Sequence, residues 1–318
     1  MKGVILAAGR GTRLYPVTKH IPKPLVPVAG KPTILYGLEQ MQGMGIREVC
    51  IVVSPDLGDQ IRDGVRALPT DVQLDVQLSY AIQEKPLGLA HAVAAARDFL
   101  GDSPFCLYLG DAIYDRSLAP FRRRFEELRC DNLNLVQVVP DPQRFGVAYV
   151  EGDRITKLVE KPKKPESNLA MAGLYFFRPS LWEAIATLEP SARGEYEITD
   201  AIQGLVERGK DVRAAVFEGR WFDTGTLPSL LACSAALLGG ASAVAPDASI
   251  NGKIGPNVSV GRGARVSCDE IANSIVLDGA DVEVPGAIRN ALLGGHVRSD
   301  SPLENVVAYG DEIERIEA

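Results

Sequence analysis

A short segment near the N-terminus combines glycines with two positive side chains. Residues 7–13 read Ala-Ala-Gly-Arg-Gly-Thr-Arg, and Lys23 follows between two prolines. Small residues let backbone N–H groups approach a ligand closely, and Arg13 and Lys23 add positive charge. We expect the flanking prolines to hold Lys23 in an extended conformation. The segment predicts a polyphosphate site, with a glycine-rich turn and a solvated arginine and lysine as the alternative.

Two aspartates have the chemistry to hold a divalent cation. Asp111 follows the apolar run Phe105–Leu109, and Asp223 follows two aromatic residues 112 positions later. A carboxylate at the end of a buried strand is costly unless it is paired or binds a cation. One or two carboxylates together with substrate phosphates are a common ligand set for Mg²⁺. The pair predicts an Mg²⁺ site that only the fold can assemble, and a turn or helix-capping role is the alternative for Asp111.

Four further residues suit a base or a sugar. The Gln83 carboxamide carries a donor and an acceptor, as the edge of a pyrimidine requires, although an ordinary surface glutamine is the alternative. Glu160 and Lys161 end a predicted strand, where adjacent side chains point to opposite sides. We therefore expect Glu160 to accept hydrogen bonds from sugar hydroxyls while Lys161 faces a phosphate. Gly173 leaves room for a sugar ring against the backbone.

Alternating strands and helices must position these groups. The short apolar run Val4–Leu6 is typical of a strand that is buried on both faces. Strand, helix, strand and helix at this spacing predict right-handed βαβ units in a doubly wound, mixed but mainly parallel α/β sheet. Ligands bind such sheets at the carboxyl ends of the strands. The predicted strands are residues 4–6, 49–53, 72–80, 105–109, 133–139, 146–150, 154–160, 171–177 and 212–217, and the predicted helices are 34–41, 57–68, 89–99, a helix ending at 208, and 227–238.

The composition limits the class of protein. A length of 318 residues favours two domains, and 46% apolar residues are enough for a full core in the larger one. The net charge of −7 argues against nucleic acid and anionic membranes as partners. The one basic cluster, Arg122–Arg124, stands beside two glutamates and is typical of a solvated helix face. Widely spaced cysteines predict neither a zinc site nor disulfides, and the absence of a signal-like start predicts a cytoplasmic protein.

The periodicity changes after a glycine-rich linker at residues 239–242. Small and apolar residues recur every six positions, and four asparagines recur at spacings of 16, 17 and 15: Asn257, Asn273, Asn290 and Asn305. This pattern predicts a catalytic domain at 1–240 and a left-handed parallel β-helix of hexapeptide repeats at 241–318. Each coil buries its face only on its neighbour, so an exposed end needs a cap or another subunit. We expect a homo-oligomer, either a dimer or a tetramer.

The N-terminal segment also resembles a family signature. Residues 6–28 are similar to the pattern L-A-[AG]-G-x-G-[ST]-R-L-x-P-x-T…P-K-P-L-x-P-V of the sugar-1-phosphate nucleotidylyltransferases, and the similarity continues through 191–200 and 221–226. Within that family the chain resembles the long-form glucose-1-phosphate thymidylyltransferases, which carry a β-helix tail. The resemblance implies a Rossmann-like catalytic domain that uses Mg²⁺. It also implies that a sugar 1-phosphate, most simply glucose 1-phosphate, attacks the α-phosphorus of a nucleoside triphosphate, most simply dTTP, and releases pyrophosphate.

The same resemblance implies roles for individual residues. The charges that act in catalysis are Arg13, Lys23, Lys161 and the metal ligands Asp111 and Asp223. The residues that bind the nucleotide are Leu6, Ala8, Gly9, Gly11, Thr12, Arg13, Gln83 and Gly88. The residues that bind the sugar phosphate are Gly146, Glu160, Lys161, Gly173 and Tyr175.

Three alternatives stay open at this point. Residues 22–25 read Pro-Lys-Pro-Leu where the short thymidylyltransferases have S-K-Q-L, so a UTP-dependent uridylyltransferase or another sugar specificity is an alternative. Some long relatives add acyl transfer on the β-helix, which needs a catalytic base. We expect His296, the one histidine of the tail, to be a turn residue instead. An inactive regulatory homologue would be expected to lose Lys23 or Asp111, and this chain keeps both.

Overall fold

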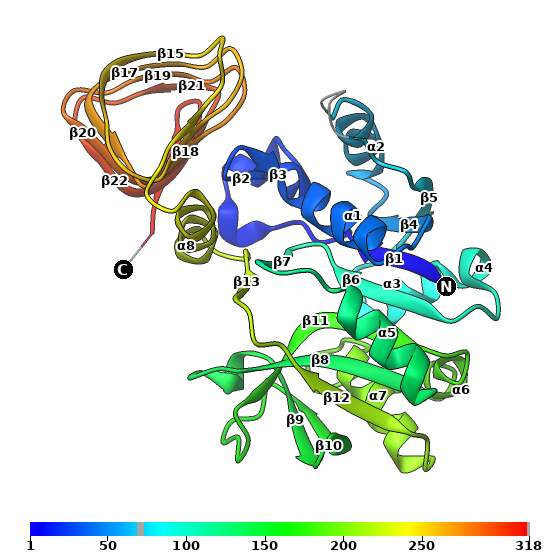
Figure 1. Cartoon of the computed structure of the whole chain (residues 1–318). Helices are drawn as coiled ribbons and strands as arrows, with labels where there is room; N and C mark the ends of the chain where they lie inside the picture. The colour runs from blue at the N-terminus through cyan, green and yellow to red at the C-terminus, as the bar shows by residue number, and fades with distance from the viewer. Residues whose placement is uncertain (69–72, 317–318) are drawn as a thin grey trace. The chain divides into compact units, whose positions relative to one another are not determined.

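The computed structural model describes residues 1–68 and 73–316, and the chain divides into two compact units (Figure 1). The first unit comprises Met1–Gly9, Gly37–Arg62 and Arg66–Trp221. The second comprises Arg10–Tyr36, Asp63–Val65 and Phe222–Ala318. The segment with Arg13 and Lys23 therefore groups with the C-terminal part of the chain, whereas the strand before it belongs to the first unit.

A nine-stranded mixed sheet forms the centre of the first unit. In spatial order its strands are β5 (Gln77–Ile82), β4 (Glu48–Val53), β1 (Lys2–Leu6), β6 (Phe105–Leu109), β11 (Leu169–Phe177), β8 (Asn132–Val138), β12 (Val212–Val216), β10 (Arg154–Glu160) and β9 (Gly146–Glu151). The first four are mutually parallel, as the βαβ pattern predicts. β12 is parallel to β8, while β9, β10 and β11 run antiparallel to each of their neighbours.

Helices pack on both faces of this sheet. On one face lies α1 (Thr33–Gly43), where a Cβ at Gly37 would stand 3.0 Å from the Tyr108 ring and 3.3 Å from Ile5. On the other face, α3 (Leu89–Ala95) and α7 (Ile198–Glu207) share one apolar core with Val4 and Leu6. Successive strand residues point to opposite faces, so β1 serves both cores. The other helices of this part of the chain are α2 (Gly58–Arg66), α4 (Arg97–Leu100), α5 (Ala119–Leu128) and α6 (Leu181–Ile185).

Two predicted elements need correction. The other predicted strands and helices are confirmed, and their ends differ from the predicted ends by no more than two residues. The single helix predicted at 89–99 is interrupted at Ala96 and resumes as α4. At the interruption the Ala96 N–H donates a hydrogen bond to Val93 O, three residues earlier. The strand predicted at 72–80 begins at Gln77, because its parallel register with β4 starts there. Its predicted first residue, Val72, lies outside the described residues.

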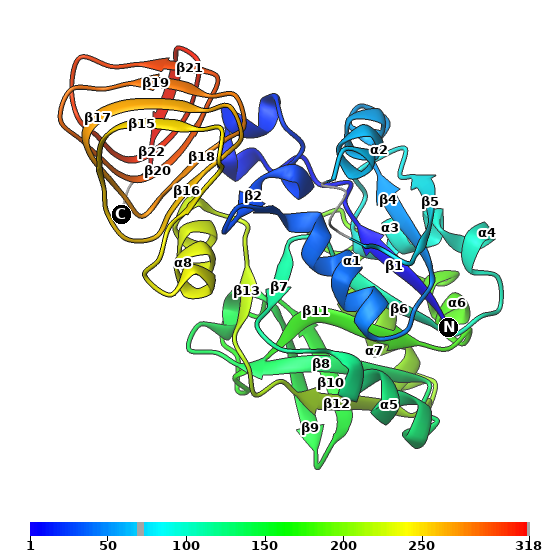
Figure 2. The ribbon, with the colours of Figure 1, turned by 45° about the horizontal axis from the view of Figure 1, so that its top comes forward.

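Strands that stack in successive coils follow α8 (Leu227–Leu238) in the second unit, and we call residues 243–316 the C-terminal stack (Figure 2). Val244, Val260, Val276, Leu293 and Ala308 lie side by side in parallel register. The last strand runs antiparallel to the one before it and so closes the stack. Its strands are β14 (Ala243–Val244), β15 (Ser249–Ile254), β16 (Val258–Val260), β17 (Arg265–Ala272), β18 (Ser274–Val276), β19 (Asp281–Glu283), β20 (Ala287–Gly294), β21 (His296–Arg298), β22 (Leu303–Tyr309) and β23 (Glu312–Arg315).

The recurring asparagines occupy one corner of each coil. All four have positive φ, a conformation that asparagine adopts more readily than most residues. Asn273 Nδ2 donates to Asn290 Oδ1 at 2.8 Å, and Asn290 Nδ2 donates to Asn305 Oδ1 at 2.9 Å. Below them, Asn257 Oδ1 accepts a hydrogen bond from the Gly240 N–H at 3.0 Å. The spacing seen in the sequence therefore marks a hydrogen-bonded ladder along the C-terminal stack.

Removing the central rung of this ladder is expected to destabilise the chain. Asn290→Ala removes two side-chain hydrogen bonds and places a poorly suited residue at a φ of 52°. We expect the free energy of unfolding to fall by about 2–4 kcal/mol, measured by urea denaturation. Asn290→Gly keeps the backbone conformation and loses only the hydrogen bonds, so it should cost less. An alanine variant as stable as the glycine variant would contradict this account.

The expectation that His296 lies in a turn is wrong. It is the first residue of β21, and its Nδ1 lies 3.5 Å from Asp281 Oδ2. Among the described residues, no helix has the length and the apolar character needed to cross a membrane. All five cysteines are free, and four of them are buried. Burial raises the pKa of Cys50 and Cys130 to about 11, as suits small core residues.

Candidate active site

Three short 3-10 turns build the segment that we call the N-terminal loop, residues 10–26. They are η1 (Thr12–Leu14), η2 (Val17–Lys19) and η3 (Lys23–Leu25). Gly11 precedes η1 with a φ of 65°, which favours glycine. A Cβ at Gly11 would stand 2.9 Å from the Cβ of Lys23, so the two residues are in contact. The glycine turn and the lysine, separated in sequence, therefore meet in the second unit.

The predicted extended conformation of Lys23 is wrong. Lys23 begins η3, in which the Leu25 N–H donates to Pro22 O at 2.8 Å and the Val26 N–H to Lys23 O at 3.1 Å. Pro22, the residue before this turn, has a φ of −51° and a ψ of 135°. The φ that proline fixes at Pro24 is also compatible with a 3-10 turn. The prolines thus stiffen a turn that begins at the lysine.

Arg13 and Asp223 lie together in the second unit. A Cβ at Gly225 would stand 2.5 Å from Arg13 Nη2 and 3.0 Å from Asp223 Oδ1. Asp223 ends β13 (Trp221–Asp223), and Gly225 lies in the two-residue connection that leads to the N-cap of α8. Because Gly225 has no side chain, the guanidinium can lie close to the backbone here. The structure thus places a predicted triphosphate ligand beside a predicted metal ligand.

In the first unit, the carboxyl ends of β1 and β6 lie side by side and position Asp111. The Gly110 N–H donates to Leu6 O at 3.0 Å, and a Cβ at Gly110 would stand 2.5 Å from that oxygen. Asp111 follows directly and is half-buried. Burial, and then the charges of Glu160 and Asp111, raise the pKa of the Tyr175 phenol, so Tyr175 stays protonated close to both carboxylates. Ala8 and Gly9 continue from Leu6 with increasing exposure.

Gln83 and Gly88 also lie together in the first unit. Gln83 Nε2 donates to Gly88 O at 3.0 Å and lies 3.2 Å from His91 Nδ1. Gly88 caps α3 with a φ of 105°, and a Cβ there would stand 2.6 Å from Tyr196 O. The Tyr196 N–H in turn donates to Leu87 O at 2.7 Å. The backbone before α7 therefore holds this glycine in place.

Glu160 sits in a small polar cluster at the end of β10. Its register partner on β9 is Gly146, where a Cβ would stand 3.2 Å from Glu160 Oε2 and 2.3 Å from Thr199 Cγ2. Thr199 Oγ1 donates to Glu160 Oε2 at 2.9 Å, and Arg193 Nη1 lies 3.4 Å from Oε1. The missing side chain at Gly146 thus makes room for the threonine that orients the carboxylate.

The prediction that Glu160 and Lys161 face opposite sides is wrong. Lys161 leaves the strand with a φ of 43°, and its Nζ lies 3.4 Å from Glu160 Oε1. Strand alternation does not apply at a residue in the left-handed region, so the two side chains converge. Gly173 has a φ of 80°, and a Cβ there would lie 3.3–3.4 Å from Leu109 and Ala112. These two residues precede and follow Asp111 closely in the sequence.

Two carboxyls near Glu160, the buried Glu197 and the half-buried Asp200, should make stability depend on pH. Burial, with a further effect from Glu160, raises the pKa of Glu197 and of Asp200. Such groups favour folding below the pKa of the unfolded chain, and their contribution is lost as the pH rises through the folded pKa. We expect Glu197→Gln to reduce the fall in the free energy of unfolding between pH 4.5 and neutrality, measured by urea titrations. An unchanged pH slope would contradict this.

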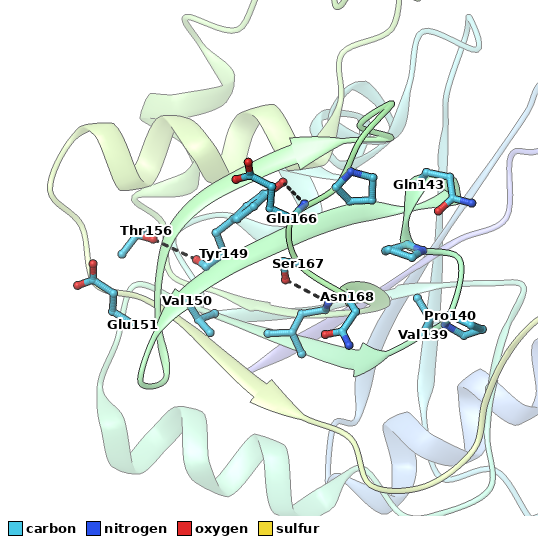
Figure 3. Close-up of a pocket in the computed structure, with 13 residues that line it drawn as sticks. Val139, Pro140, Gln143, Tyr149, Val150, Glu151, Thr156, Glu166, Ser167 and Asn168 are labelled. Carbon is cyan, nitrogen blue, oxygen red and sulfur yellow. Dashed lines mark hydrogen bonds between the residues drawn. The ribbon is translucent and has the colours of Figure 1, made fainter.

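A separate pocket of about 920 Å³ lies beside the β9–β10 hairpin (Figure 3). Its polar lining includes Tyr149, Thr156 and Glu166. Thr156 Oγ1 donates to Tyr149 O at 3.3 Å, so part of this polar surface is already satisfied. None of the site residues predicted from the sequence lines the pocket.

Within each unit the structure brings several predicted residues together. They are Leu6 with Asp111, Gln83 with Gly88, and Gly146, Glu160 and Lys161 with each other in the first unit, and Gly11 with Lys23 and Arg13 with Asp223 in the second. The sequence reading missed the supporting residues His91, Arg193, Thr199 and Gly225. Arg193, Thr199 and Gly225 lie in segments 191–200 and 221–226. The family resemblance of those two segments is the signal that points to them.

Comparisons with known proteins identify the family of this chain. The model of the family "Nucleotidyl transferase" matches residues 2–239. A glucose-1-phosphate thymidylyltransferase of Streptomyces griseus is 37% identical, over 98% of this chain and 98% of that protein. A nucleotidyltransferase of low-salt glycan biosynthesis from Haloferax volcanii is 37% identical, over 92% of each chain.

Solved structures show the same fold. A crystal structure described as a glucose-1-phosphate thymidylyltransferase from Bacillus anthracis superposes with a TM-score of 0.67 at 35% identity, over 74% of this chain and 94% of that one. A UDP-glucose pyrophosphorylase complexed with UDP-glucose gives a TM-score of 0.67 at 27% identity, over 75% and 98%. With a Rossmann-like α/β sheet, a glycine turn against a lysine, and an aspartate at a strand end, this chain belongs to the nucleotidyl transferase family.

Proposed function

We propose that this chain transfers a nucleoside monophosphate from dTTP to glucose 1-phosphate and releases pyrophosphate. The transfer between a nucleoside triphosphate and a sugar 1-phosphate rests on the family and on the S. griseus relative, which spans nearly the whole chain. The observation that carries the proposal is that, within one unit, Gly11 contacts Lys23 while Arg13 and Asp223 both lie close to Gly225. Arg13 and Lys23 therefore provide two positive charges on the N-terminal loop, and Asp223 provides a carboxylate just before α8.

The reaction requires charge neutralisation more than it requires a protein nucleophile. An oxygen of the sugar 1-phosphate forms a bond to the α-phosphorus, and the bond from that phosphorus to the bridging oxygen breaks, so that pyrophosphate leaves with the electron pair. The attacking phosphate is already an anion at neutral pH. Positive groups that hold two polyanions in line supply most of the rate enhancement. We assign Arg13 to the triphosphate, Lys23 to the α-phosphate and Lys161 to the sugar phosphate.

We further propose that Asp111 and Asp223 hold Mg²⁺. Each is a carboxylate at the end of a strand, and such oxygen donors suit this hard cation. Among the residues that the structure describes, no group of three or more histidine, cysteine or acidic side chains forms a metal site. Phosphate and water oxygens would therefore complete the coordination. The ion, when bound, would neutralise charge on the triphosphate.

The base site is assigned to Gln83 and Gly88, with Leu6, Ala8, Gly9, Gly11 and Thr12 along the nucleotide. Because Gln83 Nε2 already donates to Gly88 O, its Oε1 is the atom suited to accept a hydrogen bond from the base. The N3–H of a pyrimidine-dione ring is such a donor, and thymine and uracil both carry it. Gln83 can thus select this class of base without distinguishing its two members.

The sugar site is assigned to the cluster around Glu160. Thr199 and Arg193 hold the Glu160 carboxylate, which is placed to accept hydrogen bonds from sugar hydroxyls. Gly146 and Gly173 are assigned to the same site, where the absence of a side chain lets Thr199 pack at Gly146 and Leu109 and Ala112 pack at Gly173. The protonated Tyr175 phenol lies close to Glu160. Lys161, beside Glu160, is assigned to the phosphate of the same substrate.

Uridylyl transfer is the second candidate function. The UDP-glucose pyrophosphorylase structure covers as much of this chain as the thymidylyltransferase structure does, at lower identity. The hydrogen bond assigned to Gln83 would serve uracil equally well.

A substrate matrix tests the proposal. The purified chain would be incubated with Mg²⁺, each of dTTP, UTP, ATP, GTP and CTP, and each of several sugar 1-phosphates, with released pyrophosphate as the readout. We expect dTTP with glucose 1-phosphate to give the highest kcat/KM. A preference for UTP would select the second candidate, and no release with any pair would reject both.

We also propose a division of the chain at residue 240, with a catalytic domain before it and a left-handed hexapeptide β-helix at 241–318. Parallel pairing between coils at 15–17 residues and the asparagine ladder support the β-helix. Residues Val244 and Ile254 of the first coil are exposed, which suits a contact between subunits. We propose a cytoplasmic homo-oligomer, and light scattering on the purified chain would give its size.

A further inference from the structure

The end of the C-terminal stack contacts the N-terminal loop within the second unit. The rings of His20 and Tyr309 are stacked, with centroids 3.9 Å apart and an interplanar angle of 9°. Beside them, Lys19 Nζ donates to Glu312 Oε2. This hydrogen bond holds the pKa of Glu312 below its ordinary value, so the pair is ionic at neutral pH. The consecutive loop residues Lys19 and His20 therefore both contact the pair of strands β22 and β23.

The strand pair that makes these contacts is a tight hairpin. β22 and β23 are antiparallel, and Tyr309 and Glu312 are register partners across the turn. Gly310 in that turn has a φ of 60°, as a short hairpin connection requires. Tyr309 and Glu312 thus present an aromatic ring and a carboxylate from a rigid support.

A hydrogen bond from the buried Thr18 side chain connects this contact to the predicted triphosphate site. Lys19 ends η2, and the neighbouring Thr18 is 4% exposed. Thr18 Oγ1 donates to Gly11 O at 2.7 Å. Gly11 is the residue that packs against Lys23. A chain of direct contacts therefore runs from the hairpin through η2 to the glycine turn.

We infer that Tyr309 and Glu312 are positioning residues for nucleotide binding, which hold the N-terminal loop through His20 and Lys19. The inference rests on the proposed function of that loop. In this role the C-terminal stack supports the triphosphate site of its own chain. Neither residue needs to touch substrate. Loss of the support lets η2 and Gly11 move, and the ordering of the loop must then be provided by the nucleotide at the cost of affinity.

Nucleotide affinity and steady-state kinetics test the inference. For Tyr309→Leu we expect the Kd and KM for the nucleoside triphosphate to rise by about 2–12-fold, the range that losing one aromatic stack of about 0.5–1.5 kcal/mol provides. The KM for the sugar 1-phosphate should stay unchanged. Tyr309→Phe keeps the stack and should behave as the unaltered chain. Asp311→Asn changes the same hairpin at a side chain outside these contacts and is the matched control.

A charge exchange keeps the test independent of the tyrosine. Lys19→Glu alone should raise the Kd for the triphosphate, and Lys19→Glu with Glu312→Lys should restore it. Restoration would show that the Lys19–Glu312 ion pair itself, rather than either side chain alone, supports nucleotide binding. Unchanged Kd in both Tyr309→Leu and Lys19→Glu, or equal losses toward both substrates that follow the melting temperature, would overturn the inference. If the unaltered chain binds no nucleoside triphosphate, the proposed function itself fails.

Discussion

Replacing Lys23 with alanine is expected to lower kcat by about 10²–10³-fold, the scale for losing one group that stabilises charge in the transition state. Lys23 is half-buried, begins η3 and packs on Gly11, so its ammonium group is carried by a stiff turn rather than by a mobile arm. Negative charge builds up around the α-phosphorus as the second phosphate approaches. Without the lysine, the two polyanions repel each other with less compensation.

Initial rates at saturating concentrations of both substrates would measure this effect. Lys164→Ala removes a lysine whose side chain is exposed and is the matched control. Lys23→Arg keeps the charge and should recover part of the rate. An alanine variant within about threefold of the unaltered rate would remove Lys23 from the mechanism, since the expected effect is far larger.

Asp223→Ala is expected to lower turnover by about two orders of magnitude or more. The substitution removes a proposed Mg²⁺ ligand and also a negative charge near the Arg13 guanidinium, since both groups lie close to Gly225. Asp223→Asn keeps the shape but not the charge. We expect the asparagine variant to need a higher concentration of Mg²⁺ for half-maximal rate, because a neutral amide is a weaker ligand for this cation.

An Mg²⁺ titration at fixed substrate concentrations separates the two roles. Asp278→Ala, which removes a carboxylate paired with Arg262 on the C-terminal stack, is the control and should leave the titration unchanged. If Asp223→Asn lowers the rate with no change in the Mg²⁺ requirement, Asp223 acts through its charge near Arg13 and not as a metal ligand. A near-normal rate in both variants would exclude both roles.

The sequence was sufficient wherever a single local preference determines the structure. The apolar run Val4–Leu6 could only be a buried strand, and the glycines at 11 and 88 both take the positive φ that their type suggests. The asparagines of the tail were visible as a period because each coil needs one residue at its corner. In these cases the residue type and the spacing carry the same information.

The predictions failed where neighbouring preferences compete. Lys23 stands before a proline, which argues for an extended backbone, but two turn hydrogen bonds give η3 instead. Strand alternation predicts that Glu160 and Lys161 face opposite sides, but β10 ends at Glu160 and Lys161 has a positive φ. Thr199 could not be paired with Glu160 from sequence, because the contact joins residues 39 positions apart on a helix and a strand.

Ala29 and Gly30, which follow the N-terminal loop, contact α8 and the first coil of the C-terminal stack. The Ala29 N–H donates to Ser234 Oγ on α8 at 3.2 Å, and a Cβ at Gly30 would stand 3.6 Å from Ala243 in the first coil. Four parallel steps lie between that coil and the hairpin at Tyr309, a height of about 19 Å at the usual strand separation. Solenoid proteins commonly gain or lose whole repeats without harm. Here an extra turn of chain would lift the hairpin by about 4.8 Å and separate Tyr309 from His20. The distance between the two contacts thus restricts the number of coils in the C-terminal stack.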